Sequence, residues 1–413
     1  MKKGEGAQKL SRESAGVRED PLLSFREEFP ILAKTNYLVS NSLGPMPCTV
    51  PEKLAEYARD WGELGVKAWN RGWWEYPVEV GNEIAPLINA GAGEIVMMPN
   101  VTIAQTAVLS AMDFSKGRDT VVMTDLDFPS VRYALTEMAE RLGARVVSVR
   151  SDDGIGIDLG RLLAAIDERT CLVAVSHVLF RSASLMDADA ICKHAHEMGA
   201  LVSLDSFHAV GIVPVDVNRS KADFLTGGVL KWLCGGPGAC FLYVNPRVRD
   251  RLKPALTGWQ AHARPFAFEE TMEYTAGPFR WLNGTPVIPA LYVSAEGPRI
   301  IRRAGMEAIR AKSLRLTTRL IELADARGYK VTAARDPERR GGTVAIDVPH
   351  GYEVAQVLLS KDILVDYRVG AGIRIAPHFF TKEEEVEQVV HEIDRCLERG
   401  SWQRFTEKIA VVT

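Results

Sequence analysis

The sequence predicts an α/β protein with a mostly parallel central sheet, followed by a smaller α+β domain. Between about residues 90 and 245, short apolar, β-branched runs alternate with segments of helical period, which is typical of βαβ units in a sheet covered on both faces. After residue 295 the pattern changes to a long amphipathic stretch and then to short candidate strands. The chain has 413 residues, 46% of them hydrophobic, which suffices for one large or two closely packed domains.

The expected elements follow this order along the chain. Strands are expected at 120–125, 144–150, 171–178, 201–206 and 240–245, and later at 343–348, 363–368 and 373–377. Helices are expected at 129–143, 157–167 and 187–198, then over 299–328, ending at a glycine, and over 382–400. We therefore expect a flexible N-terminal arm over residues 1–25, a large domain over 26–290 and a small C-terminal domain over 291–413.

Composition narrows the class of protein. The net charge of −3 gives no indication of nucleic acid or an anionic membrane as a partner, and no apolar run approaches the about 20 residues that span a bilayer. The first 20 residues lack the apolar stretch of a signal peptide. The six cysteines are scattered without a C-x-x-C pair, so we expect reduced core residues and no metal site. These features predict a cytoplasmic protein that acts on a small molecule.

One lysine stands out in an apolar run of small residues. Lys231 lies in VLKWLCGGPGACFLYV, where burying a charged amine is expensive. A lysine whose pKa is lowered by burial can form a Schiff base, so an aldehyde cofactor would explain its place. The alternative is a lysine at the edge of a surface loop. The GGPG segment that follows allows the backbone to turn into the next strand.

Other polar and aromatic residues stand where expected strands end, the edge at which open parallel sheets bind ligands. Asp205 could keep a pyridine nitrogen protonated or could cap the next helix, and His208 could neighbour the cofactor or be structural. Asn100 and Thr102 open a helical segment whose free N–H groups suit a phosphate. Phe128 could cover a planar ring or belong to the core.

Several motifs spread over nearly the whole chain point to a known family. They are YLVSNSLGPMP (37–47), DFPS (127–130), the D-x-x-H of LDSFHAVG, the K-x-x-x-GGPG at Lys231, LTGWQAH (256–262), NGTP (283–286), AGMEAIRAKS (304–313) and VDYRVGAGIRIAPHFF (365–380). With them the chain resembles the fold-type I, pyridoxal-phosphate-dependent enzymes of aminotransferase class V, and among these most closely the kynureninases. The resemblance implies the fold-type I transferase fold, pyridoxal 5'-phosphate as cofactor and an L-α-amino acid as substrate.

The resemblance also implies roles for individual residues. Lys231 would hold the cofactor as an internal aldimine and then move the substrate's α-proton, while Asp205 pairs with the pyridinium nitrogen and His208 lies beside it. The cofactor-binding residues so implied are Val101, Thr102, Phe128, Ser176, Asp205, His208, Lys231, Trp259 and Thr285. Trp259 and Thr285 match positions that contact the phosphate from the neighbouring subunit, so a homodimer with shared active sites is implied. Arg374 would grip the substrate's α-carboxylate through a bidentate pair.

Two positions depart from the kynureninase pattern. Leu230 stands where kynureninases have a tyrosine that serves the phosphate and a proton-transfer step, and Val131 replaces an aspartate. We therefore expect kynurenine to be a poor substrate or none, and another α-amino acid to be the natural one.

The expected reaction is kynureninase-like. It runs through an external aldimine and an α-carbanion to Cβ–Cγ hydrolysis or β-elimination of a bulky side chain. Trp69, Trp73 and Trp74 could line the pocket for that side chain or belong to the core. The alternatives are a class V aminotransferase, an epimerase or a cysteine desulfurase-like enzyme. A non-catalytic assembly subunit of the same fold is an alternative of another class.

Overall fold

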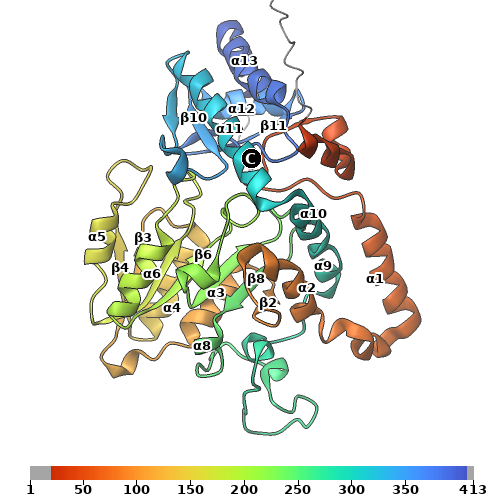
Figure 1. Ribbon diagram of the computed structural model, residues 1–413, viewed down its shortest axis with the longest axis vertical. Coiled ribbons are helices and arrows are strands. Elements are labelled where there is room, and N and C mark those ends of the chain that lie inside the picture. The colour runs from red at the N-terminus through yellow and green to blue at the C-terminus, as the bar shows by residue number, and fades with distance from the viewer. Residues whose placement is uncertain (1–19, 407–413) are drawn as a thin grey trace, which may run out of the picture.

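The computed structural model describes residues 20–406, and its centre is a seven-stranded sheet (Figure 1). The strands lie in the order β2 (Ile95–Met98), β8 (Cys240–Val244), β7 (Phe224–Gly228), β6 (Leu201–Asp205), β5 (Thr170–Ser176), β3 (Thr120–Thr124) and β4 (Arg145–Val149). Only the pairs that β8 makes with β2 and β7 are antiparallel. The mostly parallel α/β sheet predicted from the sequence is confirmed.

Apolar clusters cover both faces of this sheet. Successive side chains of a strand point to opposite faces, and accordingly Val121 and Met123 pack with helices α3 and α4 while Val122 packs with α5 and α6. The helices are α1 (Val50–Leu64), α2 (Tyr76–Ile84), α3 (Val101–Ser110), α4 (Pro129–Arg141), α5 (Leu159–Ala164), α6 (Ala188–Glu197), α7 (Val217–Ser220), α8 (Pro246–Arg249), α9 (Ile288–Ser294), α10 (Glu296–Ala304), α11 (Met306–Asp325), α12 (Gly351–Leu359) and α13 (Glu383–Arg399).

The segment around Lys231 differs from the expected pattern in one respect. Strand β7 was not predicted, because its FLTGG sequence carries two glycines, which weaken a strand. Gly228 is needed there, since a Cβ would lie 2.0 Å from the Phe207 ring. After β7 the GGPG turn, with Gly236 and Gly238 at φ of 75° and 98°, leads directly into β8. Without a crossover helix the chain returns antiparallel.

A second sheet lies at one end of the molecule, drawn in blue at the top of Figure 1. Its order is β12 (Asp366–Arg368), β13 (Gly372–Ile375), β10 (Val344–Asp347) and β9 (Lys330–Thr332), all antiparallel, and α11, α12 and α13 share its apolar cluster. The strand expected at 363–368 is divided, because β11 (Ile363–Leu364) pairs with β1 (Asn36–Tyr37) instead. The single helix expected over 299–328 is wrong: Gly305, at φ 83°, separates α10 from α11.

The structure describes the predicted N-terminal arm only in part. Of the predicted arm, residues 1–19 lie outside the described residues, and Pro21–Glu28 form a 3-10 helix with Leu22 buried. The division into large and small domains near residue 290 stays a prediction.

All six cysteines are free, but Cys48 is exposed, so the expectation that all belong to the core is wrong.

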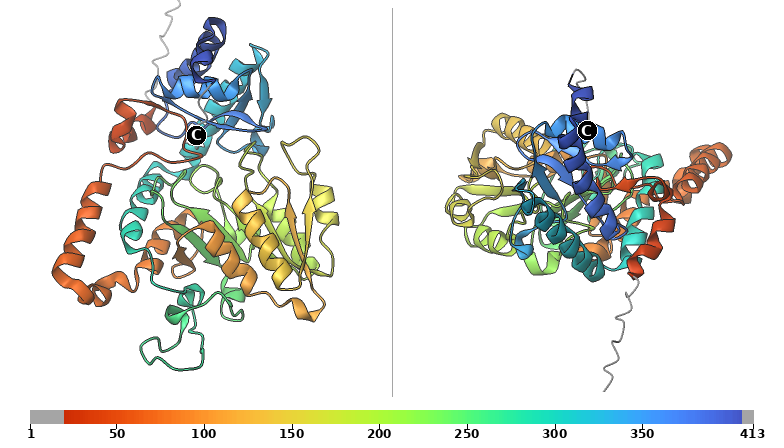
Figure 2. Two further views of the ribbon diagram at one scale, coloured as in Figure 1. Left: turned by 180° about the vertical axis from the view of Figure 1, so that it is seen from behind. Right: turned by 90° about the horizontal axis from the view of Figure 1, so that it is seen from above.

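The segment 255–285 projects from the end of the molecule opposite the second sheet, in both side views (Figures 1 and 2). Within residues 20–406, no helix is long and apolar enough to cross a membrane. The same residues hold no group of three or more His, Cys, Asp or Glu side chains suited to a metal ion.

Candidate active site

A cavity of about 160 Å³ lies at the carboxyl ends of four neighbouring strands, β7, β6, β5 and β3. It is lined by Val101, Phe128, Ser176, Phe180, Asp205, Phe207, His208, Leu230 and Lys231. Because these strands are parallel neighbours, the residues that follow each of them meet at one edge of the sheet. The cavity brings together six of the residues predicted from the sequence: Val101, Phe128, Ser176, Asp205, His208 and Lys231.

Lys231 places its amine among aromatic rings. Nζ lies 5.4 Å from the centroids of both Phe128 and Phe207 and donates to His208 Nε2 at 2.7 Å. The side chain keeps some accessible surface toward the cavity, yet the loss of water around the amine lowers the pKa of Lys231, against the opposing effect of Asp205. A larger neutral fraction of the amine follows, and the neutral amine is the nucleophilic form.

Asp205 and His208 are both buried beside this amine. Burial raises the pKa of Asp205, while a hydrogen bond from the Phe207 N–H to Oδ1 at 3.0 Å and the Lys231 charge lower it. Burial and the nearby Lys231 charge hold the pKa of His208 well below its usual value, so its imidazole is neutral and can accept from the amine. Within the described chain Asp205 forms no ion pair closer than 4.0 Å, which leaves a carboxylate facing the cavity.

These features fit an aldehyde cofactor with a phosphate. Helix α3 begins at the cavity: Asn100 caps it by accepting from the Ile103 N–H at 3.1 Å, and Val101 lines the wall. Thr102 occupies the same first turn but is half-buried and does not line the cavity. Each group of such a cofactor has a counterpart here. The helix N-terminus suits the phosphate and the amine suits the aldehyde, while the carboxylate suits a pyridinium and the Phe128 ring suits its planar face.

Arg374, the predicted carboxylate-binding residue, is held rigidly by two partners. Its Nε donates to Asp366 Oδ1 at 2.8 Å, its Nη2 donates to Asp366 Oδ2, and its Nη1 donates to the Phe180 carbonyl at 2.6 Å. Both residues of the ion pair are buried. A guanidinium has five N–H groups, so two remain without a partner among residues 20–406. Arg374 does not line the cavity itself, but it binds the carbonyl of Phe180, which does, and its charge lowers the pKa of Lys231 nearby.

Sequence reasoning missed Phe180, Phe207 and Asp366. Asp366 stands directly opposite Arg374 in the register of β12 and β13, inside the VDYRVGAGIRIAPHFF motif. Phe180 lines the cavity, contacts Phe128 edge-on at 5.4 Å and offers its carbonyl to Arg374. Of these three, only Asp366 could have been found from the sequence, as an acidic residue eight positions before Arg374. The positions of Phe180 and Phe207 depend on loop conformation.

We expect Asp366→Ala to lower the free energy of unfolding by about 3–5 kcal/mol, because Arg374 would keep a buried charge without its partner. The matched control is Asp347→Ala in the same sheet, which removes a cross-strand pair with Lys330 at 3.6 Å. That pair is exposed, so its loss should cost less than about 1 kcal/mol. Denaturant unfolding measures both, and equal effects would contradict the buried-pair account.

The remaining predicted residues lie elsewhere. Trp259 and Thr285 belong to the projecting segment 255–285 and do not line the cavity of their own chain. Trp73 is buried and its indole N–H donates to the Tyr292 hydroxyl at 2.9 Å, and Trp69 packs against its ring. The rings of Trp74 and Trp259 are in contact, with their centroids 5.1 Å apart. None of the three tryptophans lines the cavity, and Trp73 belongs to the core, the other possibility that the sequence left open.

The fold and the groups at this cavity are those of an enzyme that uses a carbonyl cofactor, and comparisons with known proteins identify which kind. The profile of the aminotransferase class-V family matches residues 37–389. A kynureninase from Burkholderia pseudomallei (strain 1106a) is 31% identical over 95% of this chain and 97% of its own length. A kynureninase from Pseudomonas fluorescens is 32% identical over 93% and 94%.

Solved structures agree in fold. A cysteine desulfurase from Thermococcus onnurineus superimposes with a TM-score of 0.79 at 24% identity, covering 91% of this chain and 98% of its own. A cystine C–S lyase in complex with cysteine persulfide gives 0.80 at 21% identity, covering 88% and 98%. The chain belongs to the aminotransferase class V family; it is a pyridoxal-phosphate-dependent enzyme of kynureninase-like type. The fold, cofactor and enzyme class predicted from the sequence are thereby confirmed.

Proposed function

We propose that this enzyme binds an L-α-amino acid by its carboxylate at Arg374 and cleaves or eliminates its side chain at the Lys231 cavity. The observation that carries the proposal is a cavity that holds the Lys231 amine beside a buried carboxylate, with the Arg374 guanidinium bonded to the carbonyl of Phe180 in its wall. The decisive experiment is a spectral titration of the cofactor-loaded protein with a panel of amino acids, including kynurenine and its 3-hydroxy form. A panel without any response would contradict the proposal.

The side chains divide the work as follows. Bound pyridoxal phosphate supplies an electron sink for the bond that breaks. Lys231 holds the cofactor and moves the α-proton at Nζ, with His208 Nε2 as the acceptor that orients the amine. Asp205 keeps the pyridine nitrogen protonated. Phe128 would cover the ring from the cavity wall, and Val101 and Thr102 would offer N–H groups at the start of α3 to the phosphate.

Other class V reactions remain the alternatives. A cysteine desulfurase uses a mobile cysteine near its substrate, whereas Cys396 is fully buried in α13 within the core of the second sheet. That position favours hydrolysis or elimination over persulfide chemistry. A non-catalytic subunit would lack the near-visible absorbance of a bound cofactor, so a colourless protein at all cofactor concentrations would favour it.

We expect kynurenine to be turned over poorly. Leu230 lines the cavity directly before Lys231 and carries no hydroxyl for a phosphate contact or a proton relay. One acid–base group typically contributes about 10²–10⁴-fold, and Leu230→Tyr should recover part of that factor. Val131, the second departure, is a buried core residue of α4 and does not line the cavity. Anthranilate release by the wild type at ordinary enzyme rates, about 1–10³ per second, would contradict this prediction.

We expect the active protein to be a homodimer in which Trp259 and Thr285 complete the partner's phosphate site. Both lie in the segment 255–285, which also exposes Phe266, Phe268 and Met272, apolar side chains that a second subunit would cover. Sedimentation of the cofactor-loaded protein should give a dimer, and Thr285→Ala should weaken cofactor retention without altering the monomer's fold. A fully active monomer would rule out the shared site.

The cellular setting that we propose is the cytoplasm. Six free cysteines and the absence of a dominant charge are typical of a protein from a reducing compartment that acts on small molecules. We propose no nucleic-acid or membrane partner. Fractionation of the producing cells tests this: recovery with membranes or nucleic acid would contradict it.

A further inference from the structure

A turn near the N-terminus carries polar side chains for which no function has been derived. Asn41 is 1% exposed and Ser40 is fully buried, yet the Asn41 amide oxygen and nitrogen and the Ser40 hydroxyl have no hydrogen-bond partner within residues 20–406. An unsatisfied buried polar group costs about 1–3 kcal/mol, so three on adjacent residues need an explanation. A ligand that pairs with them would supply one.

The turn that carries them, residues 38–44, is anchored at both ends. On one side the Ala376 N–H donates to the Leu38 carbonyl at 2.8 Å, directly after β13, the strand that carries Arg374. On the other side the Gly44 N–H donates to the Leu230 carbonyl at 2.7 Å, next to Lys231. The Cβ of any residue other than glycine at 44 would lie 2.2 Å from the Lys231 carbonyl oxygen. The turn therefore bridges the two residues between which an amino acid would be held.

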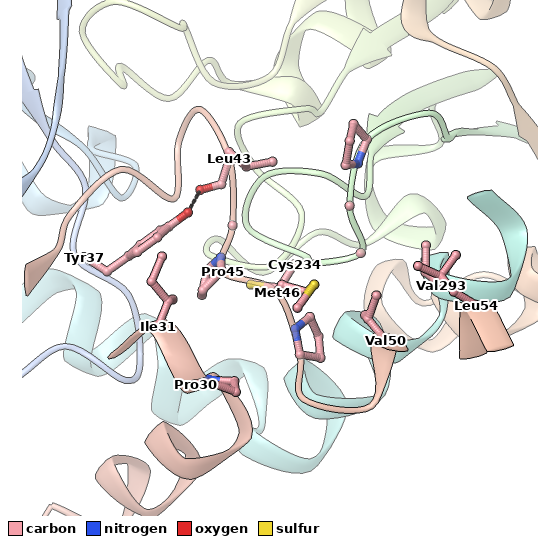
Figure 3. A pocket seen from close by; sticks show the side chains of 15 residues that line it. Pro30, Ile31, Tyr37, Leu43, Pro45, Met46, Val50, Leu54, Cys234 and Val293 are labelled. Atoms are coloured by element: carbon pink, nitrogen blue, oxygen red, sulfur yellow. Dashed lines mark hydrogen bonds between the residues drawn. The ribbon is translucent and has the colours of Figure 1, made fainter. Parts of the chain in front are cut away.

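The conformation of the turn is fixed before any ligand binds. The Tyr37 hydroxyl donates to the Leu43 carbonyl at 2.8 Å, as Figure 3 shows, and the Ser42 N–H donates to the Val39 carbonyl at 2.9 Å. The outer side of the turn borders an apolar pocket that neither Ser40 nor Asn41 lines. The hydrogen bonds of the turn hold both residues on an ordered backbone, as a binding site requires.

We propose that Asn41, with Ser40 beside it, binds the α-carboxylate of the amino-acid substrate together with Arg374. The Asn41 amide N–H and the Ser40 hydroxyl donate to the carboxylate, and the two remaining N–H groups of Arg374 take the same anion. The proposal rests on the proposed function, because it adds residues to the carboxylate site of that function. It assigns the YLVSNSLGPMP motif a role in substrate selection.

The test compares variants of the cofactor-loaded protein in their binding of L-alanine, which presents the amino-acid head group with almost no side chain. Loss of one hydrogen bond to a charged group should weaken binding by Asn41→Ala about 10- to 100-fold. Asn41→Asp should weaken it at least as much, because a carboxylate would face a carboxylate. Cofactor absorbance should match the wild type in both variants. The melting temperature without L-alanine should not fall in Asn41→Ala, since that amide makes no bond in the described chain.

The matched control is Asn36→Ala in the same segment. The Asn36 amide donates to the Glu385 carbonyl at 2.7 Å and to Gln388 at 3.1 Å, so this change should lower the melting temperature and leave L-alanine affinity unchanged. The proposal is overturned if Asn41→Ala behaves like this control and keeps L-alanine affinity within about twofold. No L-alanine binding by the wild type would instead contradict the proposed function, and this assignment with it.

Discussion

Lys231→Ala is expected to abolish turnover and to remove the near-visible absorbance of the cofactor-loaded protein. The cavity offers Lys231 as its only amine among the lining residues, so the variant loses the covalent link to the cofactor and the group that moves the α-proton. The loss of proton transfer alone corresponds to about 10²–10⁴-fold, and the loss of the covalent link adds to it. Steady-state assay and an absorbance spectrum measure the two consequences separately.

The control for this variant is Lys193→Ala, which changes an exposed lysine on α6 and should leave both readouts unaltered. The fold of Lys231→Ala should survive, since its amine pairs only with His208 among the hydrogen bonds of the described chain. Full activity in the Lys231 variant would remove the assignment of the cofactor site.

Asp205→Asn is expected to lower turnover by about 10²–10³-fold while the protein stays folded. The amide keeps an oxygen for the Phe207 N–H, so the strand end is preserved, but the negative charge that would hold a proton on the pyridine nitrogen is gone. Single-turnover absorbance measurements should show slow loss of the α-proton with normal cofactor content. Asp125→Asn is the matched control, because Asp125 follows β3, does not line the cavity, and its carboxylate accepts from the Ser151 N–H at 3.0 Å. Near-normal turnover of Asp205→Asn would mean that another group serves the nitrogen.

The part of the site built on strand ends could be predicted from the sequence. Asp205 and Ser176 end a strand, and Lys231 and Phe128 follow one; neighbouring parallel strands bring such residues to one edge whatever the details of packing. The alternation of apolar strands with helical segments along the chain was sufficient for Asp205, Ser176 and Phe128, whereas strand β7 before Lys231 was not predicted. The helix cap at Asn100 was likewise readable, because capping depends on a few adjacent residues.

The rest depends on contacts that no local pattern encodes. The Asp366–Arg374 pair follows from the register of two short strands, and the Phe180 carbonyl reaches Arg374 from a loop 194 positions away in sequence. The break at Gly305 was missed because the apolar period continues across it while the backbone does not. That the Asn41 amide has no hydrogen-bond partner within residues 20–406 can be recognised only when the positions of all neighbouring polar groups are known.

The most direct test of the account is reduction of the cofactor-loaded protein with borohydride, followed by peptide mass analysis. Borohydride converts a covalent link between an amine and the aldehyde carbon into a stable bond, so the modified residue can be located. The account predicts loss of the near-visible absorbance and a cofactor adduct on the peptide that contains Lys231. An adduct on any other lysine, or an unchanged spectrum after reduction, would contradict it.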